Sequence, residues 1–314
     1  MNNKIDLSVI IPLTEKDRHD DVRELYYNYK EGVVETGLSY EIIFVIDGDF
    51  PAVFETLQEL NKKGEKIKIS KLARWFGEST SLTVGFEQAR GDIILTLPAY
   101  QQMEGSEIPK LLNALRGYDL VIGCRWPRKD NIINRIQSRA FHRIVTLFTG
   151  FNFKDLGSGV RVMRRKVIEE VNIYGDQHRF FPLLASRYGF KVGEVDVKQS
   201  EKDVFTRVYS AGIYTRRILD LISVFFLIKF TKKPLRFFGL SGSFILAFGT
   251  LLSIVLFVQR VFFAVPLADR PIVLLALFLI VLGIQILAIG LVGEIVIFTH
   301  AKELKEYTVD EVLN

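Results

Sequence analysis

Residues 7–13 read LSVIIPL, and three segments of the same kind follow at short intervals: EIIFVID at 41–47, KIKISKLA at 66–73 and DIILTL at 92–97. Each is a short run rich in β-branched and other apolar residues, and a stretch with helical spacing follows it. Continuous apolar strands that alternate with helices are typical of a mainly parallel sheet covered on both faces. The first 125 residues therefore predict an α/β domain with a Rossmann-like sheet.

The segments between these strands complete the predicted domain. Their spacing favours a fifth strand, DLVIGC at 119–124, and helices over 20–36, 54–61, 78–89 and 106–115. Residues 126–200 are basic and read as largely helical, interrupted by GFNFKDLGSGVRVMRR at 150–165. Such sheets bind ligands at the carboxyl ends of their strands. The loops expected to carry function are therefore 12–18, 47–50, 73–77, 98–103 and 125–130.

Two long apolar runs lie near the C-terminus. Residues 237–258 and 271–293 contain 22 and 23 residues without a formal charge, separated by only 12 residues. Roughly 20 apolar residues in a helix cross a bilayer, so each run is long enough to span. Burial inside a soluble body is the alternative, and two such runs so close together disfavour it. We expect a hairpin of two transmembrane helices, 237–258 and 271–298.

The distribution of charge predicts how the chain is oriented. Residues 202–236 carry eight Lys or Arg against two Asp, a net of +6 in a chain whose total is +5. The loop between the apolar runs holds only Arg260 and Arg270 as basic residues. By the positive-inside rule, the α/β domain and both termini are expected in the cytoplasm.

The basic excess lies beside the membrane anchor, which favours anionic lipid headgroups over nucleic acid as its partner. We interpret 213–236 as an amphipathic interfacial segment, with a simple linker helix as the alternative. The predicted organisation is a domain at 1–212, this segment, the hairpin within 237–298 and a cytosolic tail at 299–314.

Several motifs occur in a recognisable order: SVIIPL, FVIDGD (44–49), LARWFGES (72–79), GYDLVIGCRWPRKD (117–130), DLGSGVRVMRR (155–165) and GIQILAIGLVGEIV (283–296). From Leu7 to the C-terminus this order resembles the family-2 glycosyltransferases, in particular the polyprenyl-phosphate branch with dolichyl-phosphate mannose synthase and undecaprenyl-phosphate sugar transferases. The resemblance implies a GT-A fold. It also implies a membrane-bound, inverting hexosyltransferase-type enzyme that moves a sugar from a nucleotide sugar to a polyprenyl phosphate or related lipid-linked acceptor in cell-surface glycan synthesis.

One motif departs from the family pattern. Where the family has an Asp-any-Asp triplet that holds Mg²⁺ or Mn²⁺, this chain reads PAYQQ at 98–102, and Ile46 replaces the first acid of the preceding VDDGS turn. Hard cations prefer charged oxygen ligands, so we assign no metal ligand and leave Mg²⁺ or Mn²⁺ open as a cofactor. Arginine pairs well with phosphate oxygens, and the arginines in the matching motifs are the candidates to replace the metal.

The resemblance places candidate residues at three parts of a site. The catalytic candidates are Asp155, Arg161, Arg125 and Arg128. The donor-binding candidates are Pro12, Leu13, Asp47, Asp49, Arg74, Gly77, Pro98, Tyr100 and Gln102. The acceptor-binding candidates are Ser138, Arg139, Ser158 and Arg207.

Several of these residues have structural alternatives. Asp47 could instead form an Asx-turn. Asp155 could instead cap a helix or loop, and Arg161 could instead belong to a surface ion pair. Arg125 and Arg128 also fit a solvated basic face, and Tyr100 a packed strand-end aromatic.

The lost acids keep a second function open. A catalytically silent relative would serve as a scaffold or binding subunit of a glycan assembly, whereas an enzyme binds a nucleotide sugar, a polyprenyl phosphate and the membrane. A homo-oligomer is compatible with both.

Overall fold

The computed structural model describes residues 4–14, 20–127, 150–173, 177–203, 234–267 and 270–300, with residues 139, 143, 145, 146 and 219. They belong to two compact units, an α/β unit within residues 4–219 and a helical unit within 234–300.

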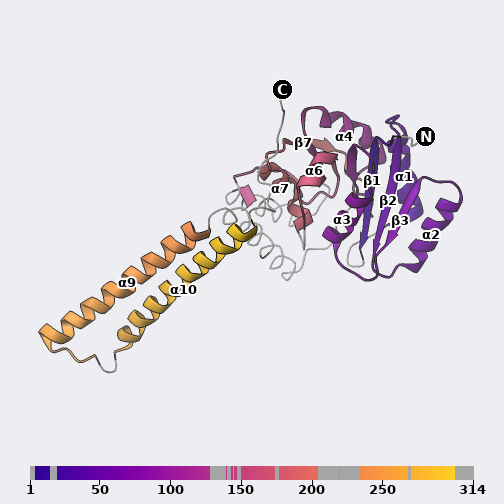
Figure 1. Ribbon diagram of the computed structural model, residues 1–314. Coiled ribbons are helices and arrows are strands. Elements are labelled where there is room, and N and C mark those ends of the chain that lie inside the picture. The colour runs from indigo at the N-terminus through magenta and orange to yellow at the C-terminus, as the bar shows by residue number, and fades with distance from the viewer. Residues whose placement is uncertain are drawn as a thin grey trace. The chain divides into compact units, whose positions relative to one another are not determined.

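A seven-stranded sheet forms the centre of the α/β unit, with the order β3-β2-β1-β4-β6-β5-β7 (Figure 1). Strand β6 is antiparallel to both of its neighbours, and the other pairs are parallel. The strands are β1 Leu7–Thr14, β2 Tyr40–Asp47, β3 Ile67–Lys71, β4 Ile93–Thr96, β5 Leu120–Arg125, β6 Arg161–Arg164 and β7 Val192–Val197. The predicted α/β class with a mainly parallel sheet is confirmed.

Helices follow the strands as the spacing predicted. All eight residues of β1 are buried, so this central strand must be covered on both faces. Helix α3 packs against β1 and β2, and α1 packs against α2 and α4. The longer helices are α1 Val22–Val34, α2 Pro51–Lys62, α3 Glu78–Gln88, α4 Ile108–Ala114, α6 Arg165–Glu170 and α7 Phe181–Arg187. Short 3-10 turns lie at Gly105–Glu107, Leu115–Gly117 and Gln177–Phe180.

The prediction that 126–200 is largely helical outside 150–165 is wrong at Val192–Val197, which forms β7, and the interruption itself contains β6. Strand β6 has only four residues, RVMR, and is fixed by its pairing with β4 and β5, which no local pattern reveals. Strand β7, VGEVDV, does alternate apolar and polar residues in part, and that period of two was the available signal.

The helical unit consists of α9, Pro234–Phe263, and α10, Pro271–His300, each 30 residues long. Both are long and apolar enough to cross a membrane, with mean hydropathies of 2.2 and 3.1. Only 17% and 11% of their most apolar windows are buried, whereas a core helix of a soluble protein is mostly buried. The predicted 213–236 segment and 299–314 tail lie almost entirely outside the described residues.

Glycines bring α9 and α10 into close backbone contact. A Cβ added at Gly283 would lie 2.6 Å from the Leu246 nitrogen, and one at Gly242 would lie 2.8 Å from the Gly283 carbonyl oxygen. Small residues at such positions let membrane helices approach closely. At the other end of α10, a Glu294 carboxylate oxygen accepts a hydrogen bond from the Leu235 amide (3.3 Å) in the first turn of α9. The two helices therefore pack as one hairpin.

Gly283→Ala is expected to lower the thermal midpoint of the hairpin, because the new methyl group would meet the α9 backbone. Overpacking of this kind costs about 1–3 kcal/mol. Circular dichroism of the full chain in detergent measures the midpoint. The matched control is Gly239→Ala, whose Cβ would meet only the Leu235 side chain, at 3.4 Å. An unchanged or raised midpoint in Gly283→Ala would contradict close backbone packing.

Candidate active site

The carboxyl ends of the parallel strands bring predicted residues from distant parts of the sequence to one edge of the sheet. Asp47 ends β2, Arg125 ends β5, and the segment 98–102 follows β4. Pro12 and Leu13 lie near the end of β1, where both are buried. This is the edge at which parallel sheets bind ligands.

Asp47 connects two of the predicted donor loops. Its fully buried carboxylate accepts hydrogen bonds from the backbone amides of Phe76 (2.6 Å) and Gly77 (2.7 Å). Gly77 has a φ of +103°, a conformation that favours glycine, and it precedes the first residue of α3. Asp47 therefore holds the β3–α3 loop against the end of β2 instead of closing a turn in its own loop.

Two other donor candidates lie on the surface. The Asp49 side chain is 87% exposed, and its carboxylate lies 4.0 Å from the Lys71 ammonium group. The Arg74 guanidinium lies over the Phe76 ring, 5.1 Å from its centroid. Both residues therefore remain accessible to a ligand that approaches this edge.

The segment 98–102, which takes the place of the Asp-any-Asp triplet, is held by buried hydrogen bonds. The Tyr29 hydroxyl donates to the carbonyls of Pro98 (3.2 Å) and Tyr100 (3.0 Å). The Gln101 amide donates to the Asp20 carboxylate (2.8 Å). The loop thus has a fixed shape without a metal ligand.

Gln102 links this segment to the 155–159 loop. Its fully buried side chain accepts a hydrogen bond from the Gly159 amide (3.0 Å) and donates one to the Tyr100 hydroxyl (2.9 Å). Ser158, predicted to contact the acceptor, is also fully buried and donates to the Gly123 carbonyl (2.6 Å). In this structure Ser158 supports the loop from within.

Arg125 and Asp155, both predicted to be catalytic, form a buried bidentate pair. The Arg125 Nε and Nη2 atoms lie 2.7 and 2.8 Å from the two Asp155 carboxylate oxygens, and Nη1 lies 3.5 Å from Asp203. Burial opposes the charged form of Arg125, but the charge and hydrogen bonds of Asp155, with Asp203, hold its pKa above the usual value. The alternatives of a solvated basic face for Arg125 and a simple cap for Asp155 do not describe this pair.

Arg161 lies in a second buried cluster, so it is not a surface ion-pair residue. Its Nη1 donates to the His178 carbonyl (2.7 Å), whereas its buried Nε has no hydrogen-bond partner. Burial lowers the pKa of Arg161 to about 10, although Glu78 and Asp155 oppose the shift. Arg161 therefore keeps its positive charge near neutral pH.

Three residues that the sequence did not predict, Glu78, Ser79 and His178, also belong to this cluster. The His178 Nε2 atom lies 2.9 Å from the Glu78 carboxylate, and its Nδ1 lies 3.2 Å from the Ser79 hydroxyl. Nearly one hundred residues separate His178 from these residues of α3, so no local sequence pattern predicts the contact.

Not every predicted residue can be placed. Arg128, Ser138 and Arg207 lie outside the described residues, and Arg139 is exposed.

The described part of this edge does not fit a divalent cation. Among the described residues, no group of three or more His, Cys, Asp or Glu side chains could hold a metal ion. Segment 98–102 has no carboxylate, and Asp155 and Asp203 both pair with Arg125. Hard cations prefer oxygen ligands that carry charge. The side chains suited to phosphate are instead cationic.

Arg125→Lys is expected to lower the thermal midpoint, because lysine keeps the charge but cannot form two parallel hydrogen bonds to Asp155. The free energy of unfolding is expected to fall by about 1–3 kcal/mol. Tryptophan fluorescence during heating measures the thermal midpoint. Arg23→Lys is the matched control, since Arg23 makes a largely exposed contact with Glu59. Equal midpoints for the two variants would contradict a structural role for the buried pair.

The stability of the fold near neutral pH is expected to depend on the ionised Glu78 carboxylate. Burial alone raises the pKa of Glu78, but His178, Arg161 and Arg179 bring it below the usual value of 4.5. A carboxylate with a lowered folded pKa stabilises the fold above its unfolded pKa and loses that contribution as the pH falls through the folded value. Glu78→Gln should therefore unfold more easily at pH 7.

The difference between Glu78→Gln and the natural chain should shrink as the pH falls below about 4.5. Urea titrations at several pH values test this, with Glu55→Gln on the exposed face of α2 as the control. A difference that grows in acid would contradict the lowered pKa of Glu78.

The chain is similar to known proteins over most of its length. The chain is 30% identical to an undecaprenyl-phosphate 4-deoxy-4-formamido-L-arabinose transferase from Pectobacterium atrosepticum, over 98% of this chain and 94% of the relative. It is 25% identical to a dodecaprenyl-phosphate galacturonate synthase from Rhizobium johnstonii, over 95% and 90%. The crystal structure of a mycobacterial protein shares the fold, with a TM-score of 0.51 and 15% identity over 70% of this chain and 74% of that one.

The family model described as glycosyl transferase family 2 matches residues 8–171, more than half of the 314 residues. The match includes β1 to β6 and most of the candidate site, namely Asp47, segment 98–102, the Arg125–Asp155 pair and Arg161. By this match and by the identity with the Pectobacterium transferase over nearly its whole length, the chain belongs to glycosyl transferase family 2.

Proposed function

We propose that this protein transfers a sugar from a nucleotide-sugar donor to a polyprenyl phosphate at the membrane surface, in the synthesis of a cell-surface glycan. The observation that carries the proposal is the presence of two exposed apolar helices, α9 and α10, in one chain with a family-2 domain. A transferase anchored in this way meets acceptors that are themselves held in the bilayer. The names of the undecaprenyl- and dodecaprenyl-phosphate relatives support the same class of acceptor.

The proposed reaction does not need a strong general base. An oxygen of the lipid phosphate attacks the anomeric carbon of the sugar from the face opposite the nucleotide. The bond from that carbon to the nucleotide diphosphate breaks, and the configuration inverts. The attacking phosphate is already an anion near neutral pH, so no strong base is needed to remove a proton. The main demand is to stabilise negative charge on the departing diphosphate.

Cationic side chains meet that demand in our proposal. Arg161 keeps its positive charge in a buried site and has an unpartnered Nε–H. Arg125 is oriented by Asp155 at the same edge of the sheet. Arginine pairs with phosphate oxygens in fixed geometry, and this lets it replace part of the charge that a divalent ion supplies. Arg128 remains a candidate for the same role from outside the described residues.

The donor nucleotide is assigned to the β1 and β2 side of the edge. Asp47 fixes the β3–α3 loop through Phe76 and Gly77, while Asp49 and Arg74 remain exposed nearby in sequence. The bias of basic residues toward the segment before α9 supports a cytoplasmic location for this domain and both termini.

One observation favours a second function, that of a binding subunit in a glycan assembly. The polar groups of segment 98–102 bond within the protein, and Arg125 is already balanced by Asp155 and Asp203. A subunit of this kind would bind partners or lipid without catalysing transfer.

The purified full chain, supplied with undecaprenyl phosphate in detergent, is expected to form a lipid-linked sugar from a suitable donor. The donors to test include nucleotide-linked galacturonate and 4-deoxy-4-formamido-L-arabinose, chosen from the names of the relatives. Mass spectrometry of the lipid extract detects the product. A chelator should reduce the rate less than in a family-2 relative with both acids of the triplet, because residues 98 and 100 are Pro and Tyr here.

Titration calorimetry with the same donors separates the two functions. A transferase binds at least one nucleotide sugar with micromolar to millimolar affinity. If no donor gives binding heat and no lipid-linked sugar forms, the enzyme proposal fails and the binding-subunit function stands.

A further inference from the structure

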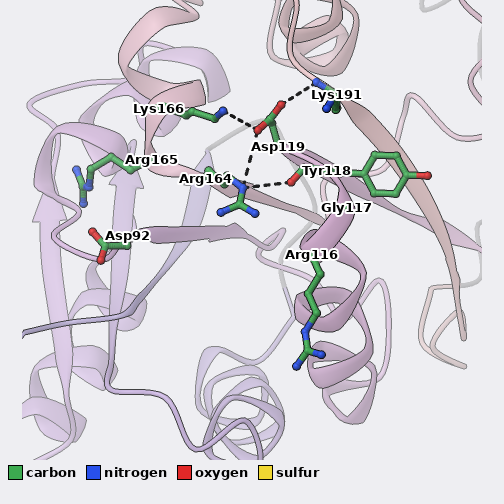
Figure 2. Close-up of a pocket in the computed structure, with 9 residues that line it drawn as sticks. All are labelled: Asp92, Arg116, Gly117, Tyr118, Asp119, Arg164, Arg165, Lys166 and Lys191. Carbon is green, nitrogen blue, oxygen red and sulfur yellow. Dashed lines mark hydrogen bonds and ion pairs between the residues drawn. The ribbon is translucent and has the colours of Figure 1, made fainter. Parts of the chain in front are cut away.

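A basic pocket lies at the opposite edge of the sheet from the candidate active site (Figure 2). It has a volume of about 520 Å³ and is formed where β5 and β7 begin and the antiparallel β6 ends. Its lining includes five cationic side chains, those of Arg116, Arg164, Arg165, Lys166 and Lys191, and two carboxylates. These side chains give the pocket a net charge of +3, and the proposed transfer reaction uses none of them.

The two carboxylates leave much of this positive charge uncompensated. Asp119 lies 2.8 Å from the Lys166 ammonium group and 3.8 Å from the Arg164 Nε. Asp92 pairs with Lys4, a further cation that lies outside the lining (2.9 Å). Among the described residues, Arg116 and Lys191 have no ion-pair partner. The pocket is therefore suited to an anionic ligand.

The cations are spread along the pocket and do not converge on one point. Figure 2 shows the guanidinium groups of Arg116 and Arg165 on opposite sides, pointing away from each other. Arg165 is held in place by the carbonyls of Ala89 (3.0 Å) and Gly91. A single phosphate group cannot contact cations arranged in this way at once. An extended ligand with several negative charges can.

An apolar groove continues from the basic pocket. It has a volume of about 450 Å³ and shares Arg116 and Arg164 with the pocket. Its other lining residues include Leu38, Leu112 and Leu115, with one carboxylate, that of Glu35. A ligand that fills both spaces therefore carries apolar side chains as well as acidic ones.

We propose that the segment 306–314 of this polypeptide, EYTVDEVLN, binds in the basic pocket and the adjoining groove. The segment lies outside the described residues and contains three acidic and no basic residues, which balance the +3 of the lining. Its apolar residues Tyr307, Val309, Val312 and Leu313 lie on either side of the acids and suit the groove. The proposal is independent of the transfer reaction, because the pocket lies at the other edge of the sheet.

Photo-cross-linking in the purified full chain tests this binding. A photoreactive phenylalanine analogue replaces Tyr118, which lines the pocket and is 44% exposed. We expect mass spectrometry to find cross-links to residues 306–314. The matched control carries the analogue at Tyr27, which is 45% exposed and lines neither the pocket nor the groove. It should give no such cross-link.

Charge reversal gives a second readout that does not depend on folding of the core. Arg116→Glu combined with Lys191→Glu should reduce the cross-link yield at least fivefold, whereas Arg23→Glu with Lys62→Glu, on α1 and α2, should leave it unchanged. Absence of the cross-link, an equal yield from Tyr27, or a yield insensitive to the reversal overturns the proposal. Cross-links from position 118 that reach only residues outside 306–314 also overturn it.

Discussion

The buried pair of Arg125 and Asp155 is the interaction on which the geometry of the candidate site depends. An unpaired charge at this depth would cost several kcal/mol, so the loop that carries Asp155 must return to the end of β5. That return places Ser158 beside the Gly123 carbonyl and Gly159 beside the Gln102 side chain. Gln102 in turn holds Tyr100, so the position of the β4 loop follows from an ion pair on β5. The charge pair thereby links segment 98–102, which Tyr29 and Asp20 also hold, to the loop that carries Asp155.

The same pair explains how a family-2 site accommodates the loss of its acidic triplet. In such a site a divalent ion would add positive charge beside the β4 loop, and carboxylates there would hold it. Here the β4 loop is neutral, and positive charge comes from the protein, as Arg125 on β5 and Arg161 on β6. Asp155 and Asp203 balance Arg125, while Glu78 accompanies Arg161 through His178. The positive charge is therefore fixed by folding, although less of it remains for a ligand.

The two edges of the sheet differ in a way that follows from strand direction. At the carboxyl edge, Arg125, Asp155 and Arg161 are largely buried and hydrogen-bonded within the protein, so their positions are set by packing. At the opposite edge, the cations of the basic pocket are more exposed, and three of them, Arg116, Arg165 and Lys191, have no ion-pair partner among the described residues. A buried charge with a partner is held in one position. An exposed charge without a partner attracts oppositely charged ligands over a longer distance, and salt weakens that attraction. Substrate chemistry fits the first edge and docking of an acidic segment fits the second.

The sequence by itself determined the order of strands and helices up to β5, the mainly parallel sheet and the two long apolar helices. These features follow from local periodicity and from the length of apolar runs, which any short window of sequence reveals. It also located Asp47, segment 98–102, Arg125, Asp155 and Arg161 by motif. Only the tertiary structure decided that β6 inserts between β4 and β5, that Arg125 pairs with Asp155 thirty residues away, and that His178 joins Glu78 and Ser79 on α3. The basic pocket belongs to this second group, because its cations come from strand ends that meet only when the sheet is assembled. Such contacts depend on long-range pairing and shared burial, and no local pattern in the chain records them.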